Sequence, residues 1–379
     1  MTALRRPTPA DAMVDPGSVT AVHQFLPALL PGDAVGMHTL QVQAALREVG
    51  LDSEIFCEAI HHQLEGSGHH FSEFGRYAKG SVLLYQFATG SVLADEVFAR
   101  PEPLVVDYHN ITPAEFFRRW DPAVANAMAW ARAQLALLAP RSAIGVGDSS
   151  YNEAELVEVG YRRTGVVPIL LDLEAMSAEV DGDARARLQE AKQDGGADWL
   201  FVGRLAPNKA QHDLIKALYA YREAYDPRAR LYLVGRRATD SYYEALTGFA
   251  VRLGVTDAVR IREGVSGGEL AAHYSTADVL VSVSEHEGFC VPPLEAMRHD
   301  LPVVAYAAGA VPETVGDAGL LLARKDPSTV AASVNRVLSD DVLRQRLIGA
   351  GRRRLGDFSL ESSKRKLVEA LAPVTGVSG

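Results

Sequence analysis

The stretch DVLVSVSEHEGFCVPPLEAMR, residues 278–298, carries the clearest sign of the fold class. Residues 278–283 are mostly apolar and β-branched, as in a buried strand, and a run typical of a helix begins at Pro292, because proline is favoured in the first turn of a helix. A polar loop that contains Glu287 joins the two. A buried strand that leads through a short loop into a helix is the repeating unit of a parallel α/β sheet.

The same alternation extends in both directions from this stretch. The other strand-like runs are 19–26, 81–87, 103–108, 142–147, 164–170, 199–203, 229–235, 258–261 and 301–306. Helical patterns lie between several of them, whereas the stretch 172–198 is polar and acidic and interrupts the series. We therefore predict two successive α/β units, each with a parallel sheet covered on both faces, joined by a linker near residue 180.

Length and composition exclude several classes of protein. The chain has 379 residues, of which 47% are hydrophobic and 23% charged, and no apolar run approaches the roughly 20 residues of a membrane-spanning helix. Two cysteines, Cys57 and Cys290, are too few for a disulfide framework or a cysteine-rich zinc site. The first eighteen residues lack the apolar core of a signal peptide. We expect a disordered tail over residues 1–18 and a cytoplasmic protein.

The net charge of −10 is unevenly distributed along the chain. Residues 1–190 carry 14 basic and 25 acidic side chains, a net charge of −11, and the remaining residues carry 24 basic and 23 acidic side chains, a net charge of +1. An acidic half is a poor electrostatic partner for nucleic acid or for an anionic membrane surface. We expect no nucleic-acid partner, at most peripheral contact with a membrane, and a phosphate site in the nearly neutral half.

Two cations follow the strand-like run that ends at Gly203. Arg204 and Lys209 lie in the segment GRLAPNK, where a glycine lets a ligand approach the backbone. Arginine can bind phosphate through two parallel hydrogen bonds, and lysine acts as a compact charge. Ligands of open α/β sheets bind beyond the carboxyl ends of the strands. The segment is therefore either a phosphate site or a loop with two solvated cations.

Glu287 and Glu295 are eight residues apart in the segment EGFCVPPLE. Carboxylates at this spacing could accept hydrogen bonds from hydroxyl pairs of one ligand, and N–H groups at the start of the helix could hold an anion or sugar hydroxyls. The alternative is a turn residue followed by a solvated helix residue. His109, in YHNITP at the end of another strand-like run, could contact a substrate hydroxyl or act as acid or base, or it could be a structural histidine.

Taken together, these motifs resemble those of the retaining nucleotide-sugar glycosyltransferases of family 4, which have the GT-B fold of two Rossmann-like domains facing each other across a cleft. The resemblance runs from about Val19 to Leu371. It rests on four segments in the family's order: the glycine loop Gly32–Gly36, YHNITP at 108–113, VGR-x4-K at 202–209, and E-x7-E at 287–295. No GxxxxGK[ST] segment occurs, which excludes a P-loop NTPase.

The resemblance implies a division into domains. After the tail, residues 19–180 would form an N-terminal acceptor-binding Rossmann-like domain, and residues 195–355 a C-terminal domain that binds the nucleotide sugar. Residues 356–379 would form a helix that crosses back to the N-terminal domain.

The resemblance also implies roles for single residues. Arg204 and Lys209 would neutralise the donor's diphosphate, Glu295 would hold the ribose hydroxyls, and Glu287 would contact the donor sugar. His109 would reach the sugar near its primary hydroxyl, and Arg204, Lys209, Glu287 and His109 would be the catalytic residues. The remaining donor-binding residues would be Gly36, against the diphosphate, and the loop Gly288, Phe289, Cys290 and Val291. Cys290 departs from the pattern, because the family usually has a glycine there, and this puts the identity of the sugar in question.

The expected reaction is the transfer of a hexose-type sugar from a UDP- or GDP-sugar to a hydroxyl of a sugar, polyol or glycan, with retention of configuration. Neither a metal nor another cofactor is expected, because the two cations stabilise the leaving phosphate. The leaving phosphate itself deprotonates the acceptor. The one Asp-x-Asp spacing considered as a metal motif, at 181–183, lies in the expected linker. The alternatives are a GT-B nucleotide-sugar 2-epimerase and a catalytically silent sugar-nucleotide-binding protein. The acidic half suits a neutral or cationic soluble acceptor, such as a sugar, polyol or aminocyclitol, unless the acidity serves only solubility.

Overall fold

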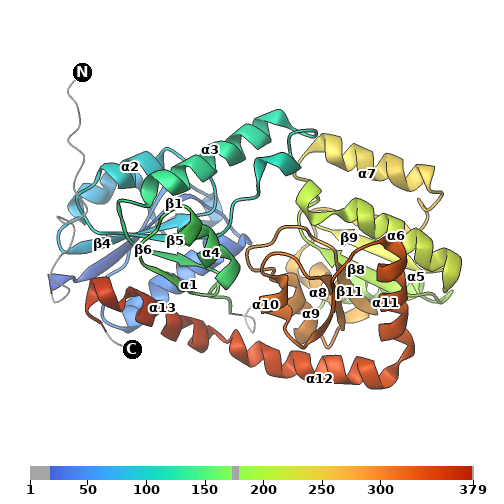
Figure 1. The fold of residues 1–379 in the computed structure, drawn as a ribbon. Helices are drawn as coiled ribbons and strands as arrows, with labels where there is room; N and C mark the ends of the chain where they lie inside the picture. The colour runs from blue at the N-terminus through green and yellow to red at the C-terminus, as the bar shows by residue number, and fades with distance from the viewer. Residues whose placement is uncertain (1–17, 173–178, 378–379) are drawn as a thin grey trace. The chain divides into compact units, whose positions relative to one another are not determined.

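The computed structural model describes residues 18–172 and 179–377. The tail expected over residues 1–18 therefore lies, except for Ser18, outside the described residues. The chain divides into two compact units: an N-terminal unit of the residues up to Ala114, Asn126–Leu171 and Ser359–Gly379, and a C-terminal unit of Glu115–Ala125 and Asp172–Phe358 (Figure 1). None of the helices in the described ranges is long and apolar enough to cross a membrane.

The N-terminal unit is built on a seven-stranded sheet in which neighbouring strands run parallel, in the order β3-β2-β1-β4-β5-β6-β7. Its strands are β1 (Ala21–Leu29), β2 (Ile55–Ile60), β3 (His69–His70), β4 (Ser81–Phe87), β5 (Leu104–Tyr108), β6 (Ser142–Gly147) and β7 (Thr164–Val166). Its helices are α1 (Ala34–Glu48), α2 (Leu93–Ala99), α3 (Pro122–Leu138, whose first turn counts with the C-terminal unit), α4 (Ser150–Glu158) and α13 (Leu360–Thr375), with 3-10 turns η3 (His62–Leu64) and η4 (Phe71–Arg76).

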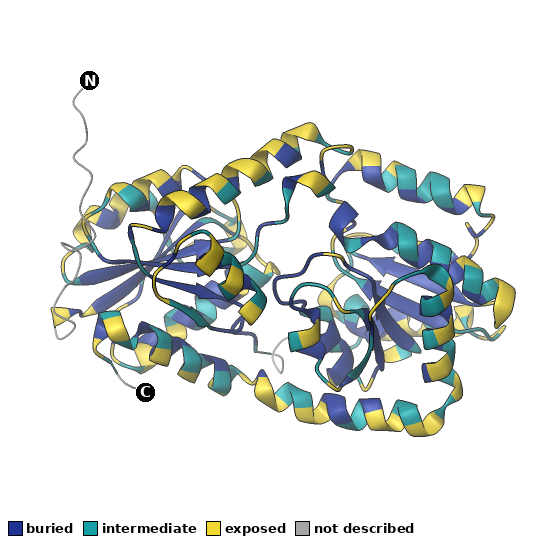
Figure 2. Ribbon diagram, viewed as in Figure 1, coloured by how far each residue is buried: buried dark blue, intermediate teal, exposed yellow. Residues whose placement is uncertain are grey.

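Alternate residues of these strands face two separate cores. Leu83, Tyr85 and Phe87 of β4 pack with α2 and α3 on one face, and Val82 and Leu84 pack with α1 and α13 on the other. The central strands β4 and β5 are therefore buried throughout, while the helices keep exposed residues on their outer sides (Figure 2). This is why the strands of a parallel sheet read as continuous apolar runs in the sequence.

The C-terminal unit has a six-stranded parallel sheet in the order β10-β9-β8-β11-β12-β13. Its strands are β8 (Asp198–Val202), β9 (Arg230–Val234), β10 (Val259–Arg262), β11 (Val279–Ser282), β12 (Val303–Tyr306) and β13 (Gly319–Leu322). Its helices are α5 (Gly182–Ala191), α6 (Gln211–Ala224), α7 (Asp240–Arg252), α8 (Gly267–Thr276), α9 (Pro292–Arg298), α10 (Val311–Val315), α11 (Pro327–Ser339) and α12 (Asp341–Asp357), with 3-10 turns η5 (Ala114–Phe116, at the junction of the units) and η6 (Pro207–Lys209).

The prediction of two parallel α/β units is confirmed, with two kinds of correction. The sequence-based prediction omitted strands β2, β3 and β13, and it placed a linker where helix α5 lies. Helix α5 was missed because Ala184 is its one buried residue, so no apolar stripe marks it. The glycine segment 32–36 is a loop only at its start, since helix α1 begins at Ala34.

A short segment from the N-terminal half packs on the C-terminal unit. The Trp120 ring meets the Tyr242 ring edge to face at 4.9 Å between centroids, and the Ser241 hydroxyl donates a hydrogen bond to the Trp120 carbonyl. Residues 115–125 therefore belong to the C-terminal unit although they precede most of it in the sequence.

Candidate functional site

The strand order of the C-terminal unit brings two of the predicted loops together. The chain leaves β8 toward β9 and β10 on one side and returns to β11 on the other, so β8 and β11 are neighbours. The loops that follow them meet at the switch point, where ligands of such sheets bind. There the Lys209 ammonium lies 2.6 Å from Oε2 of Glu287, with side chains 18% and 9% exposed. A charge-assisted hydrogen bond thus joins the two motifs.

The loop that carries Glu287 is held from two sides. The N–H of Glu285 donates to the carbonyl of Asn208 at 2.8 Å, and the N–H of Ala310 donates to the carbonyl of Glu287 at 2.9 Å. Gly309 lets this backbone come close, since a Cβ at that position would lie 2.5 Å from the Glu287 carbonyl oxygen. The position of the carboxylate is therefore set by segments that follow β8 and β12 as well as by its own loop.

Cys290 holds an unusual backbone conformation in the same loop. Its φ is +74°, in the left-handed region that favours glycine, and a residue with a side chain there costs on the order of 1–3 kcal/mol. Burial, and next the charge of Glu287, raise the pKa of the Cys290 thiol well above its ordinary value. The side chain is thus a protonated thiol beside the paired charges.

Glu295 of α9 has a protein partner. The Tyr274 hydroxyl donates to Oε2 of Glu295 at 2.6 Å, and the Tyr274 ring stacks on His299 with 5.4 Å between centroids. Burial raises the pKa of Glu295, and the hydrogen bond from Tyr274 opposes that rise. The bond uses one carboxylate oxygen, so a ligand hydroxyl pair would have to approach the other.

Arg204 is the free cation of the site. It follows Gly203, which has a φ of +147°, and its carbonyl accepts a hydrogen bond from the side-chain amide of Gln211 at 2.8 Å. The side chain is exposed and forms no ion pair with any residue in the described ranges. A guanidinium held at a strand end without a carboxylate partner suits an anionic ligand.

The sequence-based prediction missed a third cation near this loop. Lys325, which follows β13, lies 2.5 Å from Oδ2 of Asp213 in α6 and 2.6 Å from Oε1 of Glu285. Burial lowers the pKa of Lys325, but the hydrogen bonds that its ammonium donates to Asp213 and Glu285 raise the pKa more. Lys325 and its two partners are far apart in the sequence, so no local motif reveals the bridge.

Gly36 and His109 lie in the N-terminal unit. Gly36 is in the first turn of α1, where its N–H donates to the Asp33 side chain at 3.2 Å, and a Cβ would lie 2.8 Å from the Leu30 carbonyl oxygen. Packing within the unit is thus enough to require glycine there. Its contact with a diphosphate stays a prediction.

The His109 ring is buried at the end of β5. Its Nδ1 lies 2.9 Å from Oδ1 of Asp148 and its Nε2 lies 2.5 Å from Oε1 of Gln86, and the side chain is 1% exposed. Burial lowers the pKa of His109, but the charges of Asp148 and then Asp107 raise it to about 9. The hypothesis that His109 is a structural histidine therefore has direct support. Its contact with a sugar stays a prediction.

His38, Asp107 and His109 have possible metal-ligating atoms within 4.8 Å of one another. The N–H of Leu170 donates to Nδ1 of His38 at 2.9 Å, so the ring proton is on Nε2, which donates to Oδ2 of Asp107 at 2.9 Å. A metal-bound imidazole normally uses its other nitrogen as a donor, which is the reverse of this arrangement. The three residues fit a hydrogen-bond network better than a metal centre.

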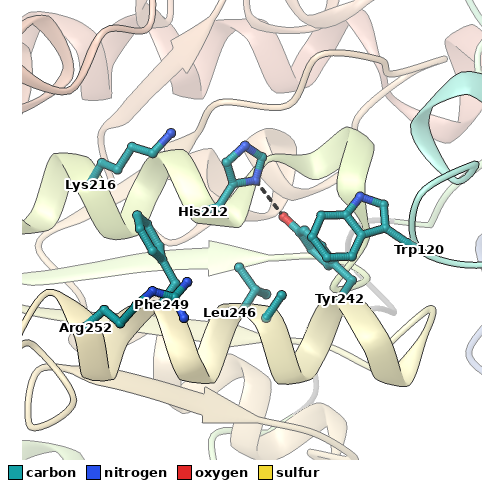
Figure 3. A pocket seen from close by; sticks show the side chains of 8 residues that line it. Trp120, His212, Lys216, Tyr242, Leu246, Phe249 and Arg252 are labelled. Carbon is teal, nitrogen blue, oxygen red and sulfur yellow. Dashed lines mark hydrogen bonds between the residues drawn. The ribbon is translucent and has the colours of Figure 1, made fainter.

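A separate hollow of about 270 Å³ lies between α6 and α7 and is lined by other residues (Figure 3). The His212 ring bonds the Tyr242 hydroxyl at 2.9 Å, and Trp120 packs on Tyr242 from outside the two helices. Phe249 and Leu246 form the apolar wall. None of the residues predicted from the sequence lines this hollow.

Comparison with known proteins shows that part of the chain is similar to one family. The model of the family described as glycosyl transferases group 1 matches residues 183–354. A D-inositol 3-phosphate glycosyltransferase of Geodermatophilus obscurus is 37% identical over 219 residues, which are 55% of this chain and 47% of that protein. A protein of the same name from Actinosynnema mirum is 35% identical over 217 residues, 54% of this chain and 50% of that protein. The matched segment thus spans about half the length of these curated relatives.

Solved structures resemble nearly the whole chain. Anabaena HepE, determined in complex with UDP and glucose, has a TM-score of 0.74 at 18% identity, over 93% of this chain and 99% of that one. Sucrose-phosphate synthase from Thermosynechococcus elongatus has a TM-score of 0.72 at 19% identity, over 95% of this chain and 100% of that one. At such identities the likeness concerns the fold. The chain has the GT-B fold, and the glycosyl transferases group 1 model matches its residues 183–354.

Proposed function

We propose that this chain is a retaining glycosyltransferase of family 4 that moves a hexose-type sugar from a UDP- or GDP-sugar to a hydroxyl of a sugar, polyol or glycan, without a metal ion. The observation that carries the proposal is the pairing of Lys209 with Glu287 beside the exposed Arg204, at the ends of two adjoining strands of the segment that the group 1 model matches. Two cations and a carboxylate are the groups that a sugar diphosphate needs.

The reaction separates charge, and the site is arranged to compensate it. The bond from the sugar's anomeric carbon to the phosphate oxygen breaks, and its electron pair leaves with the diphosphate. Arg204 and Lys209 offset this growing negative charge, which is the largest contribution that preorganised groups make. The acceptor oxygen bonds the same carbon on the same face, and its proton passes to the leaving phosphate oxygen. No protein base is needed.

Donor binding would change the partners of Lys209. In the structure its ammonium is bonded to Glu287, and a diphosphate would compete for it. The carboxylate would then be free to accept hydrogen bonds from sugar hydroxyls, while the second oxygen of Glu295 accepts from the ribose. Donor binding would thus be coupled to the release of the Glu287 carboxylate from Lys209.

The comparisons support a choice of first substrates. The HepE structures contain UDP, UDP-glucose or UDP with glucose, which favours a uridine donor. The curated relatives are named D-inositol 3-phosphate glycosyltransferases, which favours a polyol acceptor. Because the N-terminal half of this chain is acidic, both inositol and its 3-phosphate belong in the first test.

The test is a turnover assay in EDTA with UDP-glucose, UDP-N-acetylglucosamine and GDP-mannose against these acceptors, with the anomeric configuration of the product read by NMR. We expect a nucleoside diphosphate and an α-linked product from an α-linked donor. Release of a C2 epimer without acceptor would establish the epimerase, and a donor that raises Tm without product would establish the silent binding protein. A requirement for divalent metal would refute the metal-free mechanism.

A further inference from the structure

We propose that Gln86 and Asp148 are positioning residues that clamp the His109 ring from both sides, with Nε2 protonated, so that this ring cannot serve a bound ligand as an acid or base. The proposal refines the site of the proposed function but rests on contacts inside the N-terminal unit. The three residues follow or end neighbouring strands, β4, β5 and β6, which lie side by side in the sheet (Figure 1).

A chain of side-chain amides fixes the direction of each hydrogen bond. Nε2 of Gln24 donates to the carbonyl of Thr39 at 2.9 Å, and a carbonyl can only accept. Oε1 of Gln24 therefore accepts from Nε2 of Gln86, also at 2.9 Å. This turns Oε1 of Gln86 toward the ring of His109 at 2.5 Å. Both glutamines are fully buried.

The hydrogen bonds through Gln24 and Gln86, here called the amide relay, determine which ring nitrogen of His109 carries a proton. An amide oxygen accepts, so Nε2 of His109 must carry a hydrogen and donate it to Gln86. The other ring nitrogen, Nδ1, lies 2.9 Å from Oδ1 of Asp148. Whether the proton between them sits on the ring or on the carboxyl, both nitrogens are in use. The ring has no lone pair left with which to take a proton from a ligand.

Charged groups from several elements face this ring. Asp148 follows β6, Asp107 of β5 has Oδ1 3.9 Å from Nε2, Asp33 precedes α1, and His38 of α1 lies with its ring centroid 5.0 Å away. Burial opposes protonation of His109, and the three carboxylates outweigh it, so its pKa is raised to about 9. The electrostatics and the amide relay lead to the same protonated ring near neutral pH.

The main chain of His109 is more accessible than its ring. The side chain is 1% exposed, whereas the residue as a whole is half-buried, so the exposure belongs to backbone atoms. The N–H of His109 is bonded to the Phe87 carbonyl at 3.0 Å, and Asn110 follows with a φ of +70°. The clamp thus fixes the strand end and the turn, and a ligand at this strand end would meet the backbone.

Nitrogen-15 NMR of the histidine side chains in the full chain tests the clamp without any assay of turnover. We expect Nε2 of His109 to remain protonated from pH 6 to pH 8, with no titration in that range. In Asp148→Asn the carboxylate is lost with little change of shape, and we expect His109 to titrate below pH 8. A wild-type ring that titrates near pH 6.5, or that has an unprotonated Nε2, would overturn the proposal even if no variant folds.

A second pair of variants distinguishes the effect of breaking the amide relay from the effect of removing any buried or half-buried glutamine. Gln86→Leu removes the acceptor of Nε2, whereas Gln43→Leu removes a glutamine that donates to the Ser53 carbonyl at 2.9 Å outside the relay. We expect Gln86→Leu to shift the His109 resonances and to lower kcat/KM about tenfold, with a new limb in the pH profile. Equal effects of both variants would contradict a positioning role. Missing turnover in every variant and in the wild type would count against the proposed function, and the NMR result would stand.

Discussion

Removal of the Lys209 ammonium tests the central pair of the candidate site. In Lys209→Met the Glu287 carboxylate loses its partner at 2.6 Å while its side chain stays 9% exposed. Breaking a fully buried pair from one side costs roughly 3–5 kcal/mol. Because the lysine side chain is 18% exposed, water can enter, and we expect a smaller loss of about 2 kcal/mol in the free energy of unfolding.

The assay is a double-mutant cycle in urea with Lys209→Met, Glu287→Gln and the double variant. In a Trp130→Phe background, tryptophan fluorescence follows the C-terminal unit, since Trp120 and Trp199 belong to it and Trp130 belongs to the N-terminal unit. We expect the double variant to be more stable than the sum of the single effects by about 2 kcal/mol, because it contains no unpaired carboxylate.

A matched control keeps the measurement specific. Lys216→Met removes a lysine of α6 whose side chain is 41% exposed and paired with Asp213, and such surface pairs contribute about 0–1 kcal/mol. If Lys209→Met is no more costly than Lys216→Met, or if the cycle shows no coupling, the reasoning from burial is wrong.

The same variant addresses the donor. A hydrogen bond to a charged group contributes roughly 1.5–3 kcal/mol, so donor KM in Lys209→Met should rise about 10- to 150-fold, with kcat also reduced. Lys216→Met should leave donor KM unchanged. Unaltered kinetics in Lys209→Met would refute the assignment of this lysine to the diphosphate, whatever the cycle shows.

Three further predictions concern single residues. At Cys290, with a φ of +74°, the glycine variant should be more stable than the alanine variant by about 1 kcal/mol in urea, because only alanine keeps the strain; equal stabilities would contradict the strain. Tyr274→Phe removes the hydrogen bond to Glu295 and should lower Tm by an amount that corresponds to a loss of roughly 1.5–3 kcal/mol in the free energy of unfolding. An unchanged Tm would show that this bond does not stabilise the fold. The pKa of His109 is raised from 6.5 to about 9 in the folded state, so protonation of its ring adds about 3 kcal/mol to the free energy of unfolding. This stabilisation is complete below pH 6.5 and is lost as the pH rises through 9. Urea unfolding at pH 6 and pH 9.5 should show the loss in the wild type and little of it in Asp148→Asn.

The amino-acid sequence by itself was enough to predict the architecture and the two loops. The runs 81–87 and 142–147 are strands β4 and β6 with the same bounds, because strands covered on both faces consist of continuous apolar residues. Two segments, 203–209 and 287–295, each follow a buried strand. Their glycine and proline residues identify them as loops in the sequence. Such features depend on neighbours along the chain, which a sequence displays directly.

The tertiary structure alone decided which groups are partners. Lys325 bridges Asp213 and Glu285 across three elements, and the ring of His109 turns toward Gln86 and Asp148 rather than outward. Helix α5 has too few buried residues to show a periodic pattern. Hydrogen bonds and ion pairs between distant segments depend on the order of strands in the sheet, and that order is a property of the whole fold that no single segment encodes.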